Sequence, residues 1–168
     1  MFWTMSRSAI ASTVGFFLGC AFFLIVRPHE EVARPEPSAS QVLSITLKHY
    51  GCTDSELKCS VYDVTFNSDG TAIYNGYAND NYIGTYKGNL EQDDFALLVE
   101  QIREQQFFEL PLHYGDTPEE ERVSLEVVTS DARRQITTYN WSSTPVKLRA
   151  LQALVGEQVY HVYWEEDK

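Results

Sequence analysis

Three residues in one short stretch, His49, Cys52 and Cys59, are of the types that bind metal ions or take part in redox chemistry. Imidazole and thiolate are common zinc ligands, but the six residues between the cysteines are not a usual zinc spacing, and no further histidine or cysteine is close in sequence. In an oxidising compartment, this pair favours a disulfide bond, which would close an eight-residue ring and stabilise the fold by about 2.5 kcal/mol. We therefore predict a Cys52–Cys59 disulfide bond, with a metal-dependent or hydrolytic site around His49 as the alternative.

Tyrosines are concentrated in residues 61–89, and they form a second group of residues that could have a functional role. Because tyrosine combines an apolar ring with a polar hydroxyl, these side chains could line a surface for a ligand or a partner. Tyrosine is also common in half-buried strands, so packing alone is the alternative. The residues of this candidate ligand surface are His49, Tyr62, Tyr74 and Tyr86, and Tyr77 and Tyr82 lie in the same stretch.

Motifs of well-known catalytic and cofactor sites are absent from the sequence. It contains no G-x-S-x-G or H-E-x-x-H motif, and the glycines at Gly84 and Gly88 lack the phosphate-loop pattern. The adjacent acids at 93–94, 119–121 and 165–167 lie where solvated charge is expected, whereas acid–base catalysis requires a desolvated carboxyl group. We predict no catalytic residue, no metal and no cofactor, and we favour a protein that is not an enzyme.

The residues above must be positioned by strands, because apolar and polar side chains alternate around them. In residues 61–67, Tyr62, Val64 and Phe66 share one face, and the residues between them are mostly polar. Asp69–Gly70 is typical of a hairpin turn, where glycine can adopt a positive φ angle. The predicted strands are residues 42–50, 61–67, 71–78, 82–90, 122–130 and 133–141.

Two segments have the periodicity of amphipathic helices. Residues 91–108 carry apolar side chains at i, i+3, i+4 and i+7 from Phe95. The second helix is expected to start with Pro145 in its first turn, capped by Ser143 or Thr144, and residues 165–168 are expected to fray. The order of four strands, a helix, two strands and a helix predicts an α+β fold, with a mostly antiparallel sheet and both helices on one face.

The first 40 residues have a different composition from the rest. Residues 9–26 form an uncharged, mostly apolar run, close to the roughly 20 residues that a helix needs to cross a membrane. A cleaved signal peptide usually has a shorter apolar region, and a lipoprotein with its lipid on Cys20 would normally turn polar after the cysteine. We predict a membrane anchor over residues 1–27, a proline-rich tether over 28–40 and an extracytoplasmic domain over 41–168.

The net charge of −11 limits the classes of partner. An acidic surface repels phosphate backbones, so we predict no binding to nucleic acid. The predicted partners are the membrane, through the N-terminal helix, and a protein of the cell envelope. The predicted localisation is a single-pass membrane protein whose C-terminal domain is periplasmic or extracellular.

The stretch from Ile45 to Leu110 resembles an uncharacterised bacterial family of extracytoplasmic domains, known as domain of unknown function six-four-three-eight. The family opens with a strand and a cysteine pair, followed by a D-G-T hairpin, a Gly-x-x-x-Gly strand end, a helix and a Phe-Phe-x-Leu segment. The matching residues are Cys52, Cys59, Tyr62, Asp69-Gly70-Thr71, Gly84, Gly88, Phe107-Phe108 and Leu110. The cysteines are further apart here than in the family, and Ser60 replaces a proline. The resemblance implies no function, and we expect a non-enzymatic binding or interaction module.

Overall fold

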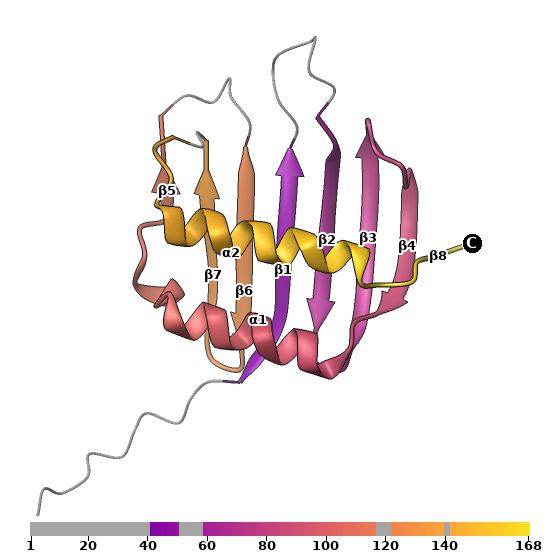
Figure 1. The fold of residues 1–168 in the computed structure, drawn as a ribbon, viewed down its shortest axis with the longest axis horizontal. Coiled ribbons are helices and arrows are strands. Elements are labelled where there is room, and N and C mark those ends of the chain that lie inside the picture. The colour runs from indigo at the N-terminus through magenta and orange to yellow at the C-terminus, as the bar shows by residue number, and fades with distance from the viewer. Residues whose placement is uncertain (1–40, 51–58, 117–121, 140–141) are drawn as a thin grey trace, which may run out of the picture. The chain divides into compact units, whose positions relative to one another are not determined.

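The computed structural model describes residues 41–50, 59–116, 122–139 and 142–168 of the chain. These residues form one sheet of eight strands, in the spatial order β5-β7-β6-β1-β2-β3-β4-β8 (Figure 1). The strands are β1 (Val42–Tyr50), β2 (Val61–Asn67), β3 (Thr71–Ala78), β4 (Gly84–Asn89), β5 (His113–Tyr114), β6 (Val123–Thr129), β7 (Arg133–Thr138) and β8 (Glu165–Glu166). All neighbouring strands are antiparallel except β5 and β7.

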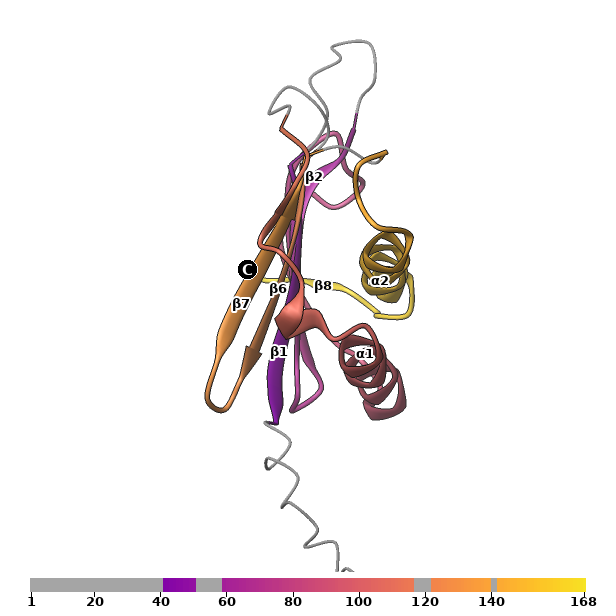
Figure 2. The same ribbon diagram turned by 90° about the vertical axis from the view of Figure 1, so that its left-hand side faces the viewer.

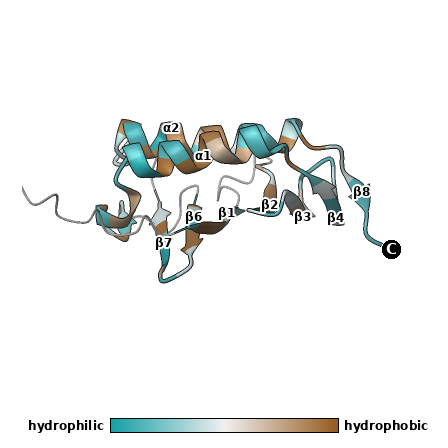
Figure 3. Cartoon of the chain, turned by 90° about the horizontal axis from the view of Figure 1, so that it is seen from below, coloured by the Kyte–Doolittle hydropathy of each residue, from teal (hydrophilic) through white to brown (hydrophobic). Residues whose placement is uncertain are grey.

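Both long helices lie on the same face of this sheet, as predicted (Figures 1 and 2). The helical elements are α1 (Gln92–Glu104), the short 3-10 helix η1 (Phe107–Glu109), α2 (Val146–Glu157) and the short 3-10 helix η2 (Gln158–Tyr160). Seen from below, the helices form one layer and the strands the other (Figure 3). No helix within the described ranges lies over the opposite face of the sheet, which we call the uncovered face.

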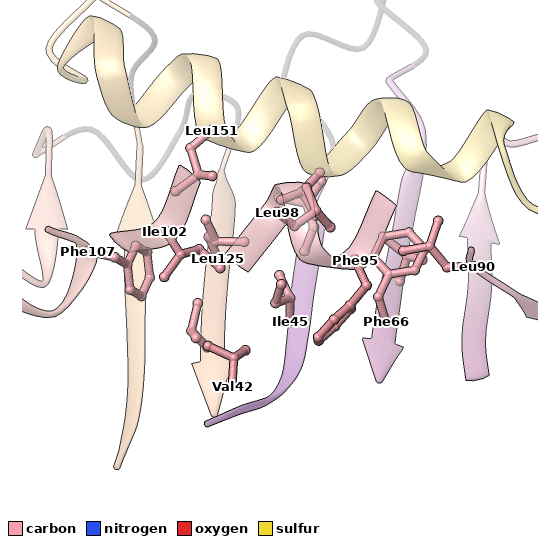
Figure 4. Packing of buried hydrophobic residues seen from close by; sticks show 14 of the residues in the cluster. Val42, Ile45, Phe66, Leu90, Phe95, Leu98, Ile102, Phe107, Leu125 and Leu151 are labelled. Carbon is pink, nitrogen blue, oxygen red and sulfur yellow. The ribbon is translucent and has the colours of Figure 1, made fainter. Parts of the chain in front are cut away.

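The hydrophobic core fills the space between the sheet and the two helices (Figure 4). The predicted stripe of α1 supplies Phe95, Leu98 and Ile102, all of which are buried. Strand alternation sends Ile45 and Phe66 into the same layer, where both are fully buried. Burial of these side chains is the main force that holds the helices to one face, since each large apolar side chain contributes about 1.5–3 kcal/mol.

The β2–β3 hairpin has the turn that its sequence predicts. Gly70 adopts a φ angle of +88°, which an L-residue rarely tolerates. Asp69 accepts hydrogen bonds through Oδ1 from the backbone N–H of Thr71 at 2.9 Å and from its hydroxyl at 2.6 Å. These bonds, the hydroxyl bond first, lower the pKa of the Asp69 carboxyl group. The turn therefore fixes the register in which β2 and β3 pair.

Several details differ from the sequence-based predictions. The sheet is extended at its two edges by short strands that were not predicted, β5 and β8. Residues 165–168 do not fray, because β8 pairs with β4 and Asp167 forms an ion pair with Lys87 at 2.9 Å. Helix α2 begins at Val146, with Pro145 as its cap position and no side-chain cap. Strands β5 and β8 are only two residues long and form by pairing with segments distant in sequence, so local sequence patterns did not predict them.

The predicted anchor and tether, residues 1–27 and 28–40, lie outside the described residues. Among the helices that the structure describes, none is long and apolar enough to cross a membrane.

Candidate functional site

The structure brings the predicted surface residues into one row of rings on the helix-facing side of the sheet. His49 on β1 stacks on Tyr62 of β2 with ring centroids 5.5 Å apart and planes at 4°. Tyr62 stacks in turn on Tyr74 of β3 at 5.2 Å. Tyr86 is the cross-strand partner of Tyr74 on β4. We call this set, completed by Tyr82, the aromatic row.

Tyr82 is the member that links Tyr74 to Tyr86. Its ring lies 5.9 Å from that of Tyr74 and 5.2 Å from that of Tyr86, in edge-on contacts. The loop that carries it can approach β3 because of Gly76, where a Cβ would lie only 1.6 Å from the carbonyl oxygen of Tyr82. A glycine inside a strand is a signal of such a close backbone approach. The glycine could therefore have predicted the contact.

Only Tyr74 of the aromatic row is fully buried, and His49, Tyr62 and Tyr86 are half-buried. Tyr74 is 2% exposed, whereas Tyr82 is 39% exposed. Trp164, from the C-terminal segment, lies 5.4 Å from the Tyr74 ring. The backbone of α2 also approaches the row, since a Cβ on Gly156 would lie 3.8 Å from the Tyr62 hydroxyl. Packing thus accounts for most of the row, and its role as a ligand surface stays a prediction.

The electrostatics of the row do not favour acid–base chemistry. Burial, followed by a hydrogen bond from its hydroxyl to Asp80, raises the pKa of Tyr74 far above its usual range. Its hydroxyl therefore remains a neutral hydrogen-bond donor at physiological pH. The Nδ1 N–H of His49 donates to the carbonyl oxygen of Ser60 at 2.6 Å, which orients the imidazole ring.

The cysteine pair is only half within the described residues. Cys59 is disulfide-bonded, and a sulfur atom in a disulfide cannot act as a thiolate ligand. Cys52 lies outside the described residues, so its pairing with Cys59 stays a prediction. Within the ranges that the structure describes, no group of three His, Cys, Asp or Glu side chains is placed to hold a metal ion.

The uncovered face carries the side chains that alternate with the core residues. Its centre is rich in hydroxyl groups that bond to one another across strands. The hydroxyl oxygens of Thr46 and Thr65 lie 2.9 Å apart, and those of Ser124 and Thr137 also lie 2.9 Å apart. Its charges occur in opposite pairs, such as Arg133 with Glu126 at 2.7 Å. This face is therefore polar but locally close to neutral.

A first hollow on the uncovered face has a volume of about 340 Å³ and lies over β1, β2 and β3. Its polar centre is Asp63, which accepts hydrogen bonds from the Tyr77 hydroxyl at 2.5 Å and from the Asn75 amide at 3.3 Å. The hydrogen bond to Asp63, and then burial, raise the pKa of Tyr77 to about 12. The other side chains that reach the hollow from this face are Lys48, Tyr50 and Val61.

Tyr50 forms the outer wall of this first hollow. The guanidinium carbon of Arg122 lies 3.7 Å from the centre of the Tyr50 ring, a cation–π contact. Such a contact is worth about 0.5–1 kcal/mol at an exposed site. It holds the Tyr50 ring in place at the edge of the hollow, although Tyr50 ends a strand and is itself exposed.

A second hollow, of about 520 Å³, lies on the same face near the edge of the sheet that β4 and β8 form. Ile73 and Lys87 are cross-strand partners there, and Lys87 is paired in turn with Glu165. Tyr163 also lines this hollow and is 82% exposed. The C-terminal segment can cross β4 because of Gly88, where a Cβ would lie 2.3 Å from Val162 Cγ1.

Sequence reasoning grouped Tyr77 with the other tyrosines and did not single out Asp63 or Tyr163. Tyr77 lies three residues after Tyr74, and an odd spacing in a strand places two side chains on opposite faces. This odd spacing could have predicted that Tyr77 lies on the face opposite to Tyr74. Tyr163 gave no comparable signal, because its position depends on the pairing of β8 with β4.

Comparison with protein families identifies the folded part of the chain. A family model described as Domain of unknown function (DUF6438) matches residues 43–159, which include both helices and seven of the eight strands. No curated protein matches the chain.

Proposed function

The chain belongs to the family Domain of unknown function (DUF6438), and we propose that it is a non-enzymatic binding module that uses the uncovered face of its sheet. We further propose that residues 1–27 anchor it in a membrane and that the domain lies outside the cytoplasm. The anchor rests on the uncharged apolar run of residues 9–26. The location rests on the cysteine pair, because disulfide bonds persist in oxidising compartments.

The observation that carries the binding role is the composition of the uncovered face. Exposed tyrosines lie beside amide, hydroxyl and charged groups, and two hollows are present. Tyrosine combined with small polar residues is typical of recognition surfaces, since a rigid ring gives contact area at low entropic cost. In the aromatic row on the other side of the sheet, Tyr74 is 2% and Tyr82 39% exposed, whereas Tyr77 and Tyr163 are 62% and 82% exposed. We therefore place the binding function on the uncovered face.

A pair of substitutions tests this assignment. Thr65→Arg places a long cationic side chain in the middle of the uncovered face, whereas Ala153→Arg adds the same group on the exposed side of α2. We expect envelope components that cross-link to the full-length chain to be lost with Thr65→Arg and kept with Ala153→Arg. Circular dichroism would check that both variants fold. Equal capture by both variants would contradict a role for the uncovered face.

A further inference from the structure

The two hollows of the uncovered face share one chemical composition. The first hollow contains Tyr77, with Lys48 and Asp63 as directly paired residues of neighbouring strands. The second contains Tyr163, with Lys87 and Glu165 paired in the same way. Each hollow thus combines an exposed aromatic ring with groups of both charge signs, since Arg122 also lies at the Tyr50 wall of the first hollow and Asp167 pairs with Lys87 of the second. The repetition is not local in sequence, since the two sets come from five different strands and from Tyr163, which lies just before β8.

The charge of each hollow argues against charged ligands. The chain carries a net charge of −11, but each hollow brings positive and negative side chains together. A polyanion would meet the carboxylates, and a polycation would meet the lysines, so neither gains a complementary potential. A neutral ligand meets no such repulsion and can accept from the ammonium groups and donate to the carboxylates.

The polar groups have spare hydrogen-bonding capacity for hydroxyl groups. A carboxylate offers about four acceptor positions, and Tyr77 and Asn75 occupy two of those on Asp63. A lysine ammonium group has three N–H donors. A hydroxyl group both donates and accepts, so a ligand rich in hydroxyls can bond to both members of each charged pair. These requirements are met by a saccharide.

The tyrosine rings supply the second half of saccharide recognition. Tyr77 is 62% exposed and Tyr163 is 82% exposed, so both rings can be covered by a ligand. The face of an aromatic ring is electron-rich and apolar, and it suits the C–H groups on the flat side of a sugar ring. In Tyr77, the hydrogen bond from the hydroxyl to Asp63 also holds the ring in place.

A line of hydrogen bonds runs from the first hollow to Thr85, two residues before Lys87 of the second hollow. Asn75 donates to Asp63, and the Thr85 hydroxyl donates to Asn75 Oδ1 at 2.9 Å, so the line crosses β2, β3 and β4. Neighbouring strands lie about 4.8 Å apart, and Asp63 on β2 is therefore about 10 Å from the strand that carries Lys87. A chain of several sugar rings can bridge that span.

We infer that the uncovered face binds a neutral oligosaccharide, with one sugar ring in each hollow and further sugar rings along the polar line between them. This inference rests on the proposed binding function and adds the class of ligand to it.

The test measures binding of three neutral hexasaccharides, of β-1,4-glucose, α-1,4-glucose and β-1,4-N-acetylglucosamine, to the full-length chain in detergent by titration calorimetry. Dextran sulfate serves as the polyanionic probe. We expect at least one neutral hexasaccharide to bind and dextran sulfate not to bind. Tyr77→Ala and Tyr163→Ala are each expected to weaken binding about tenfold, the effect of losing a central aromatic contact.

Tyr160→Ala is the matched control, because Tyr160 is 87% exposed, lines neither hollow and belongs to η2, which directly follows α2. We expect it to leave binding unchanged. Absence of binding to all three neutral sugars, or binding that neither hollow variant weakens, would overturn the inference. If envelope components are still captured and Thr65→Arg still abolishes capture, the proposed binding function stands while the saccharide is excluded as its ligand.

Discussion

At the scale of single residues, Asp63 is the group on which the first hollow depends. It is half-buried on β2, the strand between β1 and β3, and it accepts hydrogen bonds from both Tyr77 and Asn75. Because the carboxylate favours the neutral phenol, the pKa of Tyr77 rises from 10.0 to about 12. A group whose pKa is raised on folding contributes stability below its unfolded pKa. The stabilisation that the Tyr77–Asp63 contact gives the folded state is therefore fully present below pH 10 and is lost as the pH rises through about 12.

Removing the charge of Asp63 should lower the raised pKa of Tyr77. In Asp63→Asn, we expect the pKa of Tyr77 to move from about 12 back towards 10.0, since an amide oxygen does not repel a phenolate as a carboxylate does. The ionisation of Tyr77 is measured as the ultraviolet difference between the chain with Tyr77 and the matching Tyr77→Phe variant. Asn75→Ala is the control, because it removes a hydrogen bond to Asp63 but keeps the charge. An unchanged Tyr77 titration in Asp63→Asn would contradict this account.

At the scale of elements, two glycines decide how closely other segments approach the sheet. Gly76 of β3 lies under the backbone of the Tyr82 loop, where a Cβ has no space. Gly156 of α2 faces Leu47 and Tyr62, where a Cβ would meet its neighbours at 3.6 and 3.8 Å, an ordinary van der Waals distance. The same substitution should therefore have opposite effects at the two sites.

We expect Gly76→Ala to lower the free energy of unfolding by about 3 kcal/mol, because it forces the Tyr82 loop off β3. Gly156→Ala is expected to raise it by up to about 1 kcal/mol, since alanine favours a helix more than glycine does. Urea denaturation measures both changes against the unmodified chain. Destabilisation of similar size in both variants would show that the spacing at Gly76 has no special role.

Local patterns predicted the elements better than their partners. The alternation in 61–67 and the turn at Asp69–Gly70 were sufficient for the β2–β3 hairpin, because both are properties of neighbouring residues. The second hollow could not be predicted, because it depends on Lys87 and Glu165, which are distant in sequence. The four residues of the predicted ligand surface do lie side by side, but packing against α2 and Trp164 buries Tyr74 and leaves the other three half-buried. Such burial is a tertiary effect that strand periodicity does not report.

At the scale of the whole molecule, the proposed anchor determines where the binding face can act. Residues 9–26 contain no charged side chain, which is the requirement for a spanning helix. The acidic net charge of the chain gives no attraction to anionic lipid headgroups. Attachment to a membrane would therefore depend on the N-terminal segment alone.

Deleting residues 1–27 should move the protein from the membrane fraction to the soluble fraction, since this removes the proposed helix. Extraction at alkaline pH followed by centrifugation measures the distribution. Cys20→Ala is the matched control. We expect this variant to remain in the membrane fraction, as a helix does not need the thiol. Its release would point to a lipid on Cys20 and would contradict the helical anchor.

The position of β8 has a consequence for the timing of folding. The chain enters the sheet through the central strand β1, and the place beside β4 is filled by residues 165–166, which follow all the other strands in sequence. A ribosome synthesises residues 164–167 after the rest of the sheet, so the β4 edge, the Trp164 contact with Tyr74 and the Lys87–Asp167 ion pair cannot form until these residues have emerged. Until then, the nascent chain lacks its complete sheet. A chain that has not yet completed its fold is also one that an export channel for unfolded polypeptides can still accept.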